Sequence, residues 1–193
     1  MDLVFATHNA NKLKEVSLLL PKDIRLISLD DLGCHEEIPE TETTLEANAQ
    51  LKADYITKHY GISCFADDTG LIIDALNGAP GVHSARFAGK EKDSEKNMEK
   101  VLFELKNITS RTARFKTVIA LNLNKKRILF EGVVEGTITK EKQGTQGFGY
   151  DPIFIPMGYD QTFAQLPIHI KNKISHRGKA LQKLIIYLTK QGI

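Results

Sequence analysis

Two adjacent carboxylates, Asp67 and Asp68, are the side chains whose types and spacing point most directly to chemistry. They follow the strand-like run 62–66 and precede Thr69 and Gly70. Two carboxylates at a strand end are costly to place unless solvent, a metal or a basic partner stabilises them, and hard oxygen ligands are what Mg²⁺ requires. Because successive strand side chains point to opposite faces, we expect one carboxylate to face a cleft and the other to brace the turn. The structural alternative is an Asx-type turn closed by Thr69 and Gly70.

A polar turn between a strand-like run and a helix-like run is the second candidate site. Its members are Thr7, His8, Asn9, Ala10, Asn11 and Lys12, with Glu15 one helical turn past Lys12. Where a strand turns into a helix, backbone N–H groups and the positive end of the helix dipole point at one place, so the turn predicts phosphate binding. Helix capping by Asn9 or Asn11 alone is the alternative. The chain contains no Walker-type P-loop sequence.

The loop before the second predicted helix is strongly acidic. It carries Glu36, Glu37, Glu40 and Glu42. Such a cluster is by default a solvated loop, although one of its carboxylates could reach a metal. Lys52 on the following helix and Arg86 in the run HSARF (83–87) are isolated cations. On spacing alone, each is more often a surface charge than a ligand.

A third group combines a glycine-rich loop with polar residues near the end of the chain. It consists of Phe148, Gly149, Tyr150 and Asp151 with Lys171, Ser175, His176 and Arg177. An aromatic ring is a stacking platform for a base, and His and Arg can donate hydrogen bonds to a ring carbonyl oxygen. Together these residues resemble a purine pocket. Taken singly, Phe148 is more often a core residue and Ser175 a helix cap.

Hydrophobic periodicity predicts a mixed α/β body around these sites. Strands are expected at 3–6, 24–27, 62–66 with a further apolar run at 71–73, 113–123, 128–138 and 153–155, and helices at 12–20, 44–60, 94–105 and 179–188. The two long strands, separated by 124–126, are expected to form an antiparallel hairpin. Neither a repeat nor a linker interrupts the chain, so residues 1–193 are predicted to form a single domain.

Bulk composition excludes several functional classes. The 193 residues carry 26 basic and 24 acidic side chains, a net charge of +2, which is too near neutral for a general nucleic-acid or membrane-surface role. No apolar run is long enough to span a membrane. Two cysteines and no signal peptide before the first strand favour a reducing, cytoplasmic location.

Five ordered motifs give the chain a specific resemblance over nearly its whole length. They are ATHNANKLKE at 6–15, FADDTGL at 65–71, GAPGVHSARFAG at 78–89, GFGYDPIF at 147–154 and ISHRGKAL at 174–181. On these motifs the chain resembles the inosine/xanthosine triphosphate pyrophosphatases, which hydrolyse noncanonical purine nucleotides. The resemblance implies an elongated two-lobed α/β fold with a long central mixed sheet, flanking helices and a cleft between the lobes. It further implies a homodimer and Mg²⁺-dependent hydrolysis of ITP, dITP or XTP to the monophosphate and pyrophosphate.

The resemblance also assigns roles by position. Asp68 is expected to be the general base and, with Glu40, a metal ligand. The phosphate chain is expected to lie against 7–12, with Lys52 and Arg86 as further cations and Thr69 contacting substrate. The nucleoside is expected to contact Phe148, Gly149, Tyr150, Asp151, Lys171, His176 and Arg177. Donors from His176 and Arg177 aimed at a 6-keto oxygen would accept hypoxanthine or xanthine and reject adenine, whose amino group is also a donor.

Two other functions remain open at this stage. One is a Maf-like pyrophosphatase of other modified nucleotides. The other is a catalytically silent module that binds nucleotides, although the intact pair of aspartates argues against it. A nucleic-acid-binding role is disfavoured by the near-neutral charge.

Overall fold

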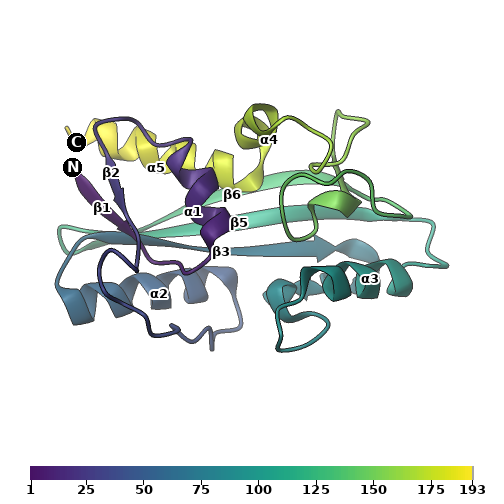
Figure 1. Cartoon of the computed structure of the whole chain (residues 1–193), viewed down its shortest axis with the longest axis horizontal. Coiled ribbons are helices and arrows are strands. Elements are labelled where there is room, and N and C mark those ends of the chain that lie inside the picture. Colours follow the sequence, from purple (N-terminus) through teal and green to yellow (C-terminus); the bar gives the residue numbers. More distant parts are fainter. Residues whose placement is uncertain (193) are drawn as a thin grey trace. The chain divides into compact units, whose positions relative to one another are not determined.

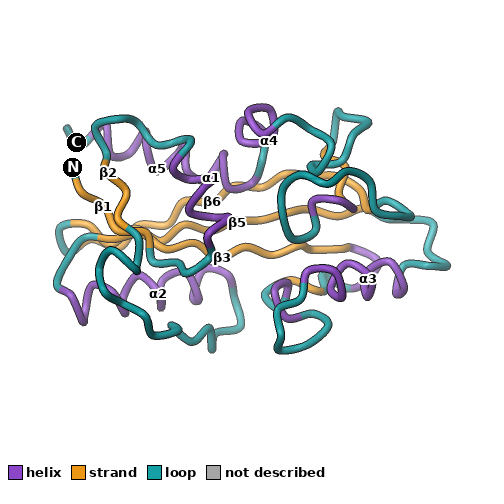
Figure 2. The backbone as a smooth tube through the Cα atoms, in the orientation of Figure 1, coloured by secondary structure: helices purple, strands orange, loops and turns teal. Residues whose placement is uncertain are grey.

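A mixed β-sheet with helices packed on its faces forms the framework of the chain (Figures 1 and 2). The computed structural model describes residues 1–192. Its strands are β1 (Asp2–Phe5), β2 (Arg25–Ile27), β3 (Cys64–Ile73), β4 (Pro80–Gly81), β5 (Thr112–Leu123), β6 (Lys126–Ile138) and β7 (Phe154–Pro156). Its α-helices are α1 (Ala10–Ser17), α2 (Leu45–Tyr60), α3 (Ser94–Glu104), α4 (Ile168–Ile174) and α5 (His176–Lys190). Short 3₁₀ helices are η1 (Asp74–Leu76), η2 (Ser84–Arg86) and η3 (Asp151–Ile153).

The sheet order among the described strands is β2-β1-β3-β5-β6-β7, with β4 paired to β3. β1 runs parallel to β2 and β3, whereas β3 is antiparallel to β4 and β6 to β7. The two long strands β5 and β6 are neighbours joined at Asn124 and Lys125, whose φ angles of 50° and 65° are those of a tight hairpin turn. The predicted mixed sheet is therefore confirmed.

Two compact units divide the chain, and β3, β5 and β6 contribute residues to both. Unit 1 comprises Met1–Asp68, Thr117–Gly132 and the residues from Arg177 on. Its core is apolar and includes Phe5 stacked on Phe65, with ring centroids 4.5 Å apart. Within this unit, α1 and α5 lie on one side of the strands and α2 on the other (Figure 1).

Unit 2 comprises Thr69–Lys116 and Val133–His176. Its core contains Phe115, Phe154 and Phe163, whose rings pack on one another. Asp93 caps α3 by accepting hydrogen bonds from two backbone N–H groups of the first turn. In this unit α3 and α4 lie on opposite sides of the strands (Figure 1).

Four features differ from the sequence-based expectations. The segment 67–70 is not a turn, because β3 runs without interruption from Cys64 to Ile73. The first helix ends at Ser17 rather than at residue 20, since Leu19 and Leu20 close a turn onto the carbonyl oxygen of Val16. The helix α4, directly after Pro167, was not expected, and α5 begins at His176 rather than at residue 179.

Candidate functional site

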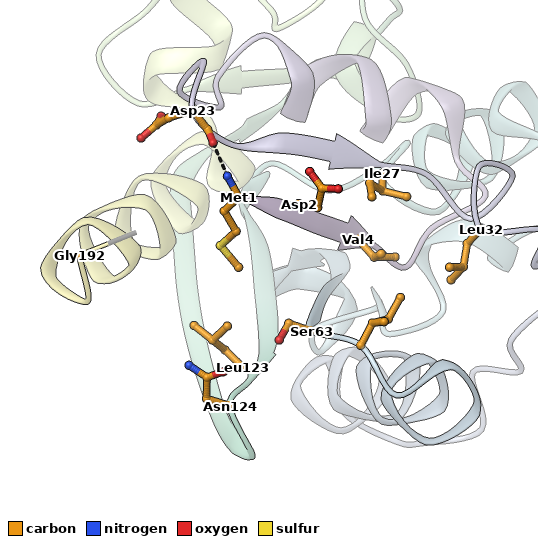
Figure 3. Close-up of a pocket in the computed structure, with 11 residues that line it drawn as sticks. Met1, Asp2, Val4, Asp23, Ile27, Leu32, Ser63, Leu123, Asn124 and Gly192 are labelled. Carbon is orange, nitrogen blue, oxygen red and sulfur yellow. Dashed lines mark hydrogen bonds between the residues drawn. The ribbon is translucent and has the colours of Figure 1, made fainter.

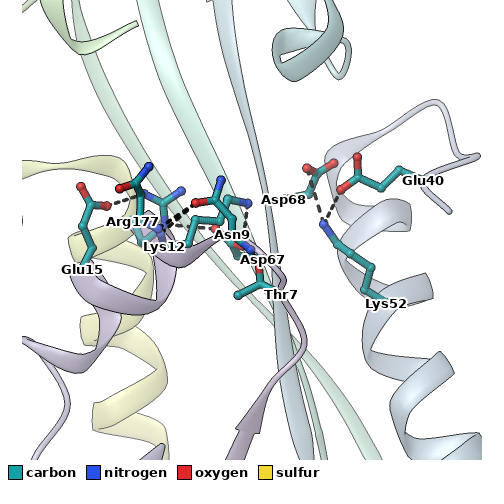
Figure 4. Close-up of polar contacts among 10 residues, drawn as sticks. Thr7, Asn9, Lys12, Glu15, Glu40, Lys52, Asp67, Asp68 and Arg177 are labelled. Carbon is teal, nitrogen blue, oxygen red and sulfur yellow. Dashed lines mark hydrogen bonds and ion pairs between the residues drawn. The ribbon is translucent and has the colours of Figure 1, made fainter. Parts of the chain in front are cut away.

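The two adjacent aspartates lie in the middle of β3 and have different partners (Figure 4). Asp67 accepts hydrogen bonds from Lys12 Nζ at 2.7 Å and from Arg177 Nε at 3.1 Å. Asp68 Oδ1 lies 3.8 Å from Lys52 Nζ. The alternation of side chains along a strand explains why the two carboxylates have different partners. Neither carboxylate braces a turn, because residues 67–70 belong to β3, and the expectation that one of them faces a cleft stays a prediction.

Lys52 joins Asp68 to the acidic loop that precedes α2. Its ammonium group donates to Glu40 Oε1 at 2.7 Å, and its side chain is buried. Burial lowers the pKa of Lys52, but the charges of Asp68 and Glu40 outweigh burial and raise it overall. Burial raises the pKa of Asp68, although Lys52 and Lys12 act in the opposite direction. A carboxylate with a raised pKa is suited to accept a proton from water.

The cations around Asp67 favour its ionised form. Its side chain is 1% exposed, and burial alone would raise its pKa. The charges of Lys12, Arg177 and Lys52 more than offset burial, so the pKa of Asp67 lies well below its usual range. Arg177 Nη1 also donates to Glu15 Oε2 at 2.6 Å. Consecutive carboxylates on one strand therefore have pKa values shifted in opposite directions.

The polar turn at 7–11 leads into α1 and is largely exposed. Asn9 is the N-cap, and its side chain accepts hydrogen bonds from the N–H groups of Asn11 and Lys12 at 3.0 and 3.2 Å. Thr7 Oγ1 accepts from the N–H of Asn9, and the ring of His8 hydrogen-bonds to the carbonyl oxygen of Glu36. The capping alternative is thus confirmed for Asn9, and phosphate binding by this turn stays a prediction.

In unit 2, the glycine-rich loop is held by a buried ion pair. The carboxylate of Asp151 pairs with Lys171 and accepts a hydrogen bond from the N–H of Phe148 at 2.8 Å. Lys171 Nζ lies 5.1 Å from the centroid of the Phe148 ring. Gly147 has a φ of 76°, and a Cβ there would collide with the Asp151 carboxylate. The pair therefore fixes the position of a half-buried aromatic ring.

His176 lies in the same unit as this loop. Its ring stacks on Phe115 with centroids 4.5 Å apart and an interplanar angle of 17°, and it is 4% exposed. Its neighbour in sequence, Arg177, belongs to unit 1. The structure thus places two residues of the SHR motif in different local environments.

Tyr150 connects the glycine-rich loop to the segment that carries Arg86. Its hydroxyl donates to the carbonyl oxygen of Ser84 at 2.7 Å, and its side chain is buried. Ser84 in turn donates to the carbonyl oxygen of Gly81 and accepts from the N–H of Leu71. These contacts order η2, at whose end the half-buried Arg86 lies.

Tyr150→Phe is expected to destabilise the protein by about 1 kcal/mol, because the Ser84 carbonyl oxygen loses its buried donor while the ring keeps its packing. Chemical denaturation monitored by circular dichroism measures the change. The matched control is Tyr159→Phe, since Tyr159 is 40% exposed. Equal stabilities of Tyr150→Phe and the wild-type protein would contradict the assignment.

The predicted site residues therefore form two groups. Glu40, Lys52 and Asp68 meet in unit 1, next to Lys12, whereas Phe148, Asp151 and Lys171 meet in unit 2. Thr69 and Gly149 are half-buried members of β3 and the glycine-rich loop. Sequence reasoning did not anticipate the role of Glu15 as a partner of Arg177, although its spacing of three residues from Lys12 placed both on one helical face.

The carboxylates near Lys52 have the donor chemistry of a magnesium site. Mg²⁺ binds in proteins through one or two carboxylates, with waters and substrate phosphates as the remaining ligands. Glu40 and Asp68 provide such a pair, and their oxygens already lie around one cation, Lys52 Nζ. Residues 1–192 contain no group of three or more acidic, His or Cys side chains arranged to hold a metal without other ligands. The donor set fits a metal that arrives with a phosphate substrate.

A separate hollow of about 840 Å³ lies at the amino-terminal end of unit 1 (Figure 3). Its walls are mainly apolar and include Val4, Ile27, Leu32 and Leu123, with Asp2 and Asp23 among its few polar residues. None of the residues assigned to catalysis or substrate binding lines it. This hollow is distinct from the charged group around Asp67 and Asp68.

A protein-family model describing the Ham1 family matches residues 3–187. The chain belongs to the Ham1 family. A relative from Flavobacterium johnsoniae, named dITP/XTP pyrophosphatase, is 57% identical over 189 residues, which cover 98% of each chain. A protein of the same name from Bacillus subtilis is 48% identical and covers 95% of this chain and 94% of its own. The structure of the Staphylococcus aureus Ham1 protein superimposes with a TM-score of 0.90 at 39% identity, covering 99% of this chain and 100% of that one.

Two further properties concern the helices and the cysteines of this Ham1 protein. No helix within residues 1–192 combines the length and apolar character that crossing a bilayer demands. Cys34 and Cys64 are buried free thiols.

Proposed function

We infer that this chain hydrolyses noncanonical purine nucleoside triphosphates to the nucleoside monophosphate and pyrophosphate, which removes them from the nucleotide pool. The grouping of Glu40, Lys52 and Asp68 within a full-length Ham1 match is the observation that carries this conclusion. It combines a buried carboxylate of raised pKa with a cation and a second carboxylate. dITP and XTP, the substrates in the names of its relatives, are the proposed substrates of this chain.

The residues of unit 1 provide the chemistry that cleavage of a polyphosphate requires. Lys12 and Lys52 are cations able to bind the phosphate chain, and Asp68 orients the attacking water and accepts its proton. General-base assistance typically contributes about 10²- to 10⁴-fold, so cations near the phosphates must supply much of the remaining acceleration. Glu40 and Asp68 would hold Mg²⁺. When bound, Mg²⁺ would neutralise the phosphate oxygens and stabilise the departing pyrophosphate.

The residues of unit 2 provide the groups that binding of a purine base requires. The half-buried ring of Phe148 offers a stacking surface, held by the Asp151–Lys171 pair. His176 is a donor of the kind that would select a 6-keto oxygen and reject an amino group. Gly149 and Tyr150 shape the loop, and Thr69 and Arg86 are proposed to contact the substrate.

We further propose that the protein is a homodimer and works in the cytoplasm. The family resemblance supports the dimer, and the two free cysteines support a reducing compartment, where thiols stay reduced. Light scattering coupled to size-exclusion chromatography tests the dimer, and a monomeric mass would remove that proposal.

A substrate panel tests the function directly. With Mg²⁺, we expect dITP, ITP and XTP to be turned over at least about a hundredfold faster than ATP, since two unpaired buried donors each cost about 1–3 kcal/mol. Monophosphate and pyrophosphate should appear in equal amounts, and EDTA should stop the reaction. Faster turnover of pyrimidine triphosphates would favour a Maf-like specificity, and binding without pyrophosphate release would favour a silent module. Activity that persists in EDTA would contradict the magnesium site.

A further inference from the structure

Four buried or largely buried charges of unit 1 form a chain of alternating sign (Figure 4). Lys12 Nζ is 2.7 Å from Asp67 Oδ1, Arg177 Nε is 3.1 Å from Asp67 Oδ2, and Arg177 Nη1 is 2.6 Å from Glu15 Oε2. Lys12 and Glu15 lie three residues apart on α1, Asp67 lies on β3, and Arg177 lies in the first turn of α5. Three elements far apart in sequence therefore meet through these side chains.

Lys12 has two competing anionic partners in the proposed reaction. It contacts Asp67 now, and it must contact a phosphate oxygen when substrate binds. A buried carboxylate that loses its partner cation is strongly destabilised. Because Arg177 binds the other oxygen of Asp67, that carboxylate stays paired with a cation while Lys12 moves to the substrate.

Arg177 needs a second carboxylate to stay in this position. Its side chain is 3% exposed and lies at the N-terminal end of α5, where the helix dipole disfavours a cation. Glu15, with a side chain 7% exposed, supplies the compensating charge from α1. The guanidinium group has a planar fork of donors that can bind two carboxylates at once, which an ammonium group cannot do in the same geometry.

We propose that Glu15 is a positioning residue, which holds Arg177 on Asp67 so that Lys12 can leave Asp67 and bind the phosphate chain. The inference rests on the proposed function and gives Arg177 a role in holding Asp67, beside the contact with the base that the family resemblance implies. Glu15 acts only through its neighbours and touches no substrate.

Glu15→Gln, which preserves shape and removes the charge, is the first test variant. We expect the Kd for magnesium pyrophosphate, measured by calorimetry, and the KM for dITP to rise about fivefold to tenfold, with a smaller change in kcat. If Glu15 acted only as a nearby negative charge, its removal would tighten the binding of anions. If it acted only in folding, the melting temperature would fall while Kd and KM stayed unchanged. Either result would overturn the proposal.

Arg177→Lys is the second variant and remains informative if Glu15→Gln folds poorly, because a lysine cannot span both carboxylates. It should raise the same two constants, and unchanged constants would refute the proposal. In a Lys12→Met background, Glu15→Gln should raise Kd and KM by less than about twofold, because the lysine through which Glu15 acts is absent. An undiminished effect in that background would also refute it.

The matched control is Glu135→Gln, the same chemical change in a half-buried pair with Arg114 of unit 2, which should alter neither constant. Wild-type activity on dITP separates the two proposals. A wild-type protein without hydrolysis would remove the proposed function, and its pyrophosphate affinity would still decide whether Glu15 sets the anion affinity of Lys12.

Discussion

Asp68→Asn is expected to lower kcat for dITP by about 10³-fold or more while changing the affinity for nucleotide far less. The amide cannot accept a proton from water, and general-base catalysis alone is worth about 10²- to 10⁴-fold. Loss of a carboxylate from the proposed metal pair adds to this effect. Steady-state kinetics gives kcat, and calorimetry with ITP gives the affinity.

The matched control for this variant is Asp74→Asn, the same change in an exposed carboxylate paired with Arg114. It should leave kcat within about twofold of the wild-type value, as is usual for exposed groups away from the site. Wild-type turnover by Asp68→Asn would eliminate Asp68 as the general base.

Lys52→Met is expected to cost about 3 kcal/mol of stability and nearly all activity. It leaves the carboxylates of Glu40 and Asp68 without the buried cation that they share, and breaking a buried pair is strongly destabilising. Addition of Mg²⁺ should recover part of this stability, because a divalent cation can replace the ammonium group. Thermal unfolding with and without Mg²⁺ measures both effects.

Lys58→Met on the same helix is the control, since Lys58 is exposed in the last turn of α2. It should neither lose comparable stability nor gain more from Mg²⁺ than the wild-type protein does. A Lys52→Met variant that is insensitive to Mg²⁺ would argue against Glu40 and Asp68 as metal ligands.

Local patterns were sufficient to predict the elements that carry the charged site. Helical periodicity predicted α2 almost to the residue. The period of two along a strand accounts for the different partners of Asp67 and Asp68, although the predicted turn is absent. The motif resemblance assigned Glu40, Lys52 and Asp68 to one site. In the structure, Glu40 and Asp68 both lie within ion-pair distance of the Lys52 ammonium group.

Other features depend on tertiary contacts that no local pattern encodes. Residues 67–70 look like a turn because Asp, Asp, Thr and Gly favour turns, yet sheet pairing and the cations from α1, α2 and α5 hold them in a strand. The contact between Glu15 and Arg177 joins residues 162 positions apart. The short helix α4 was missed because its seven residues offer too few turns for a clear periodicity.

The long separation between Glu15 and Arg177 constrains when unit 1 can mature during biosynthesis. Asp67 and Glu15 are synthesised 110 and 162 residues before Arg177, whose guanidinium group joins them from α5. A nascent chain still held by the ribosome with α5 inside the exit tunnel would carry Asp67 and Glu15 without their shared arginine. This arrangement of charges therefore forms only after α5 has been synthesised, and a chain terminated before α5 would lack it.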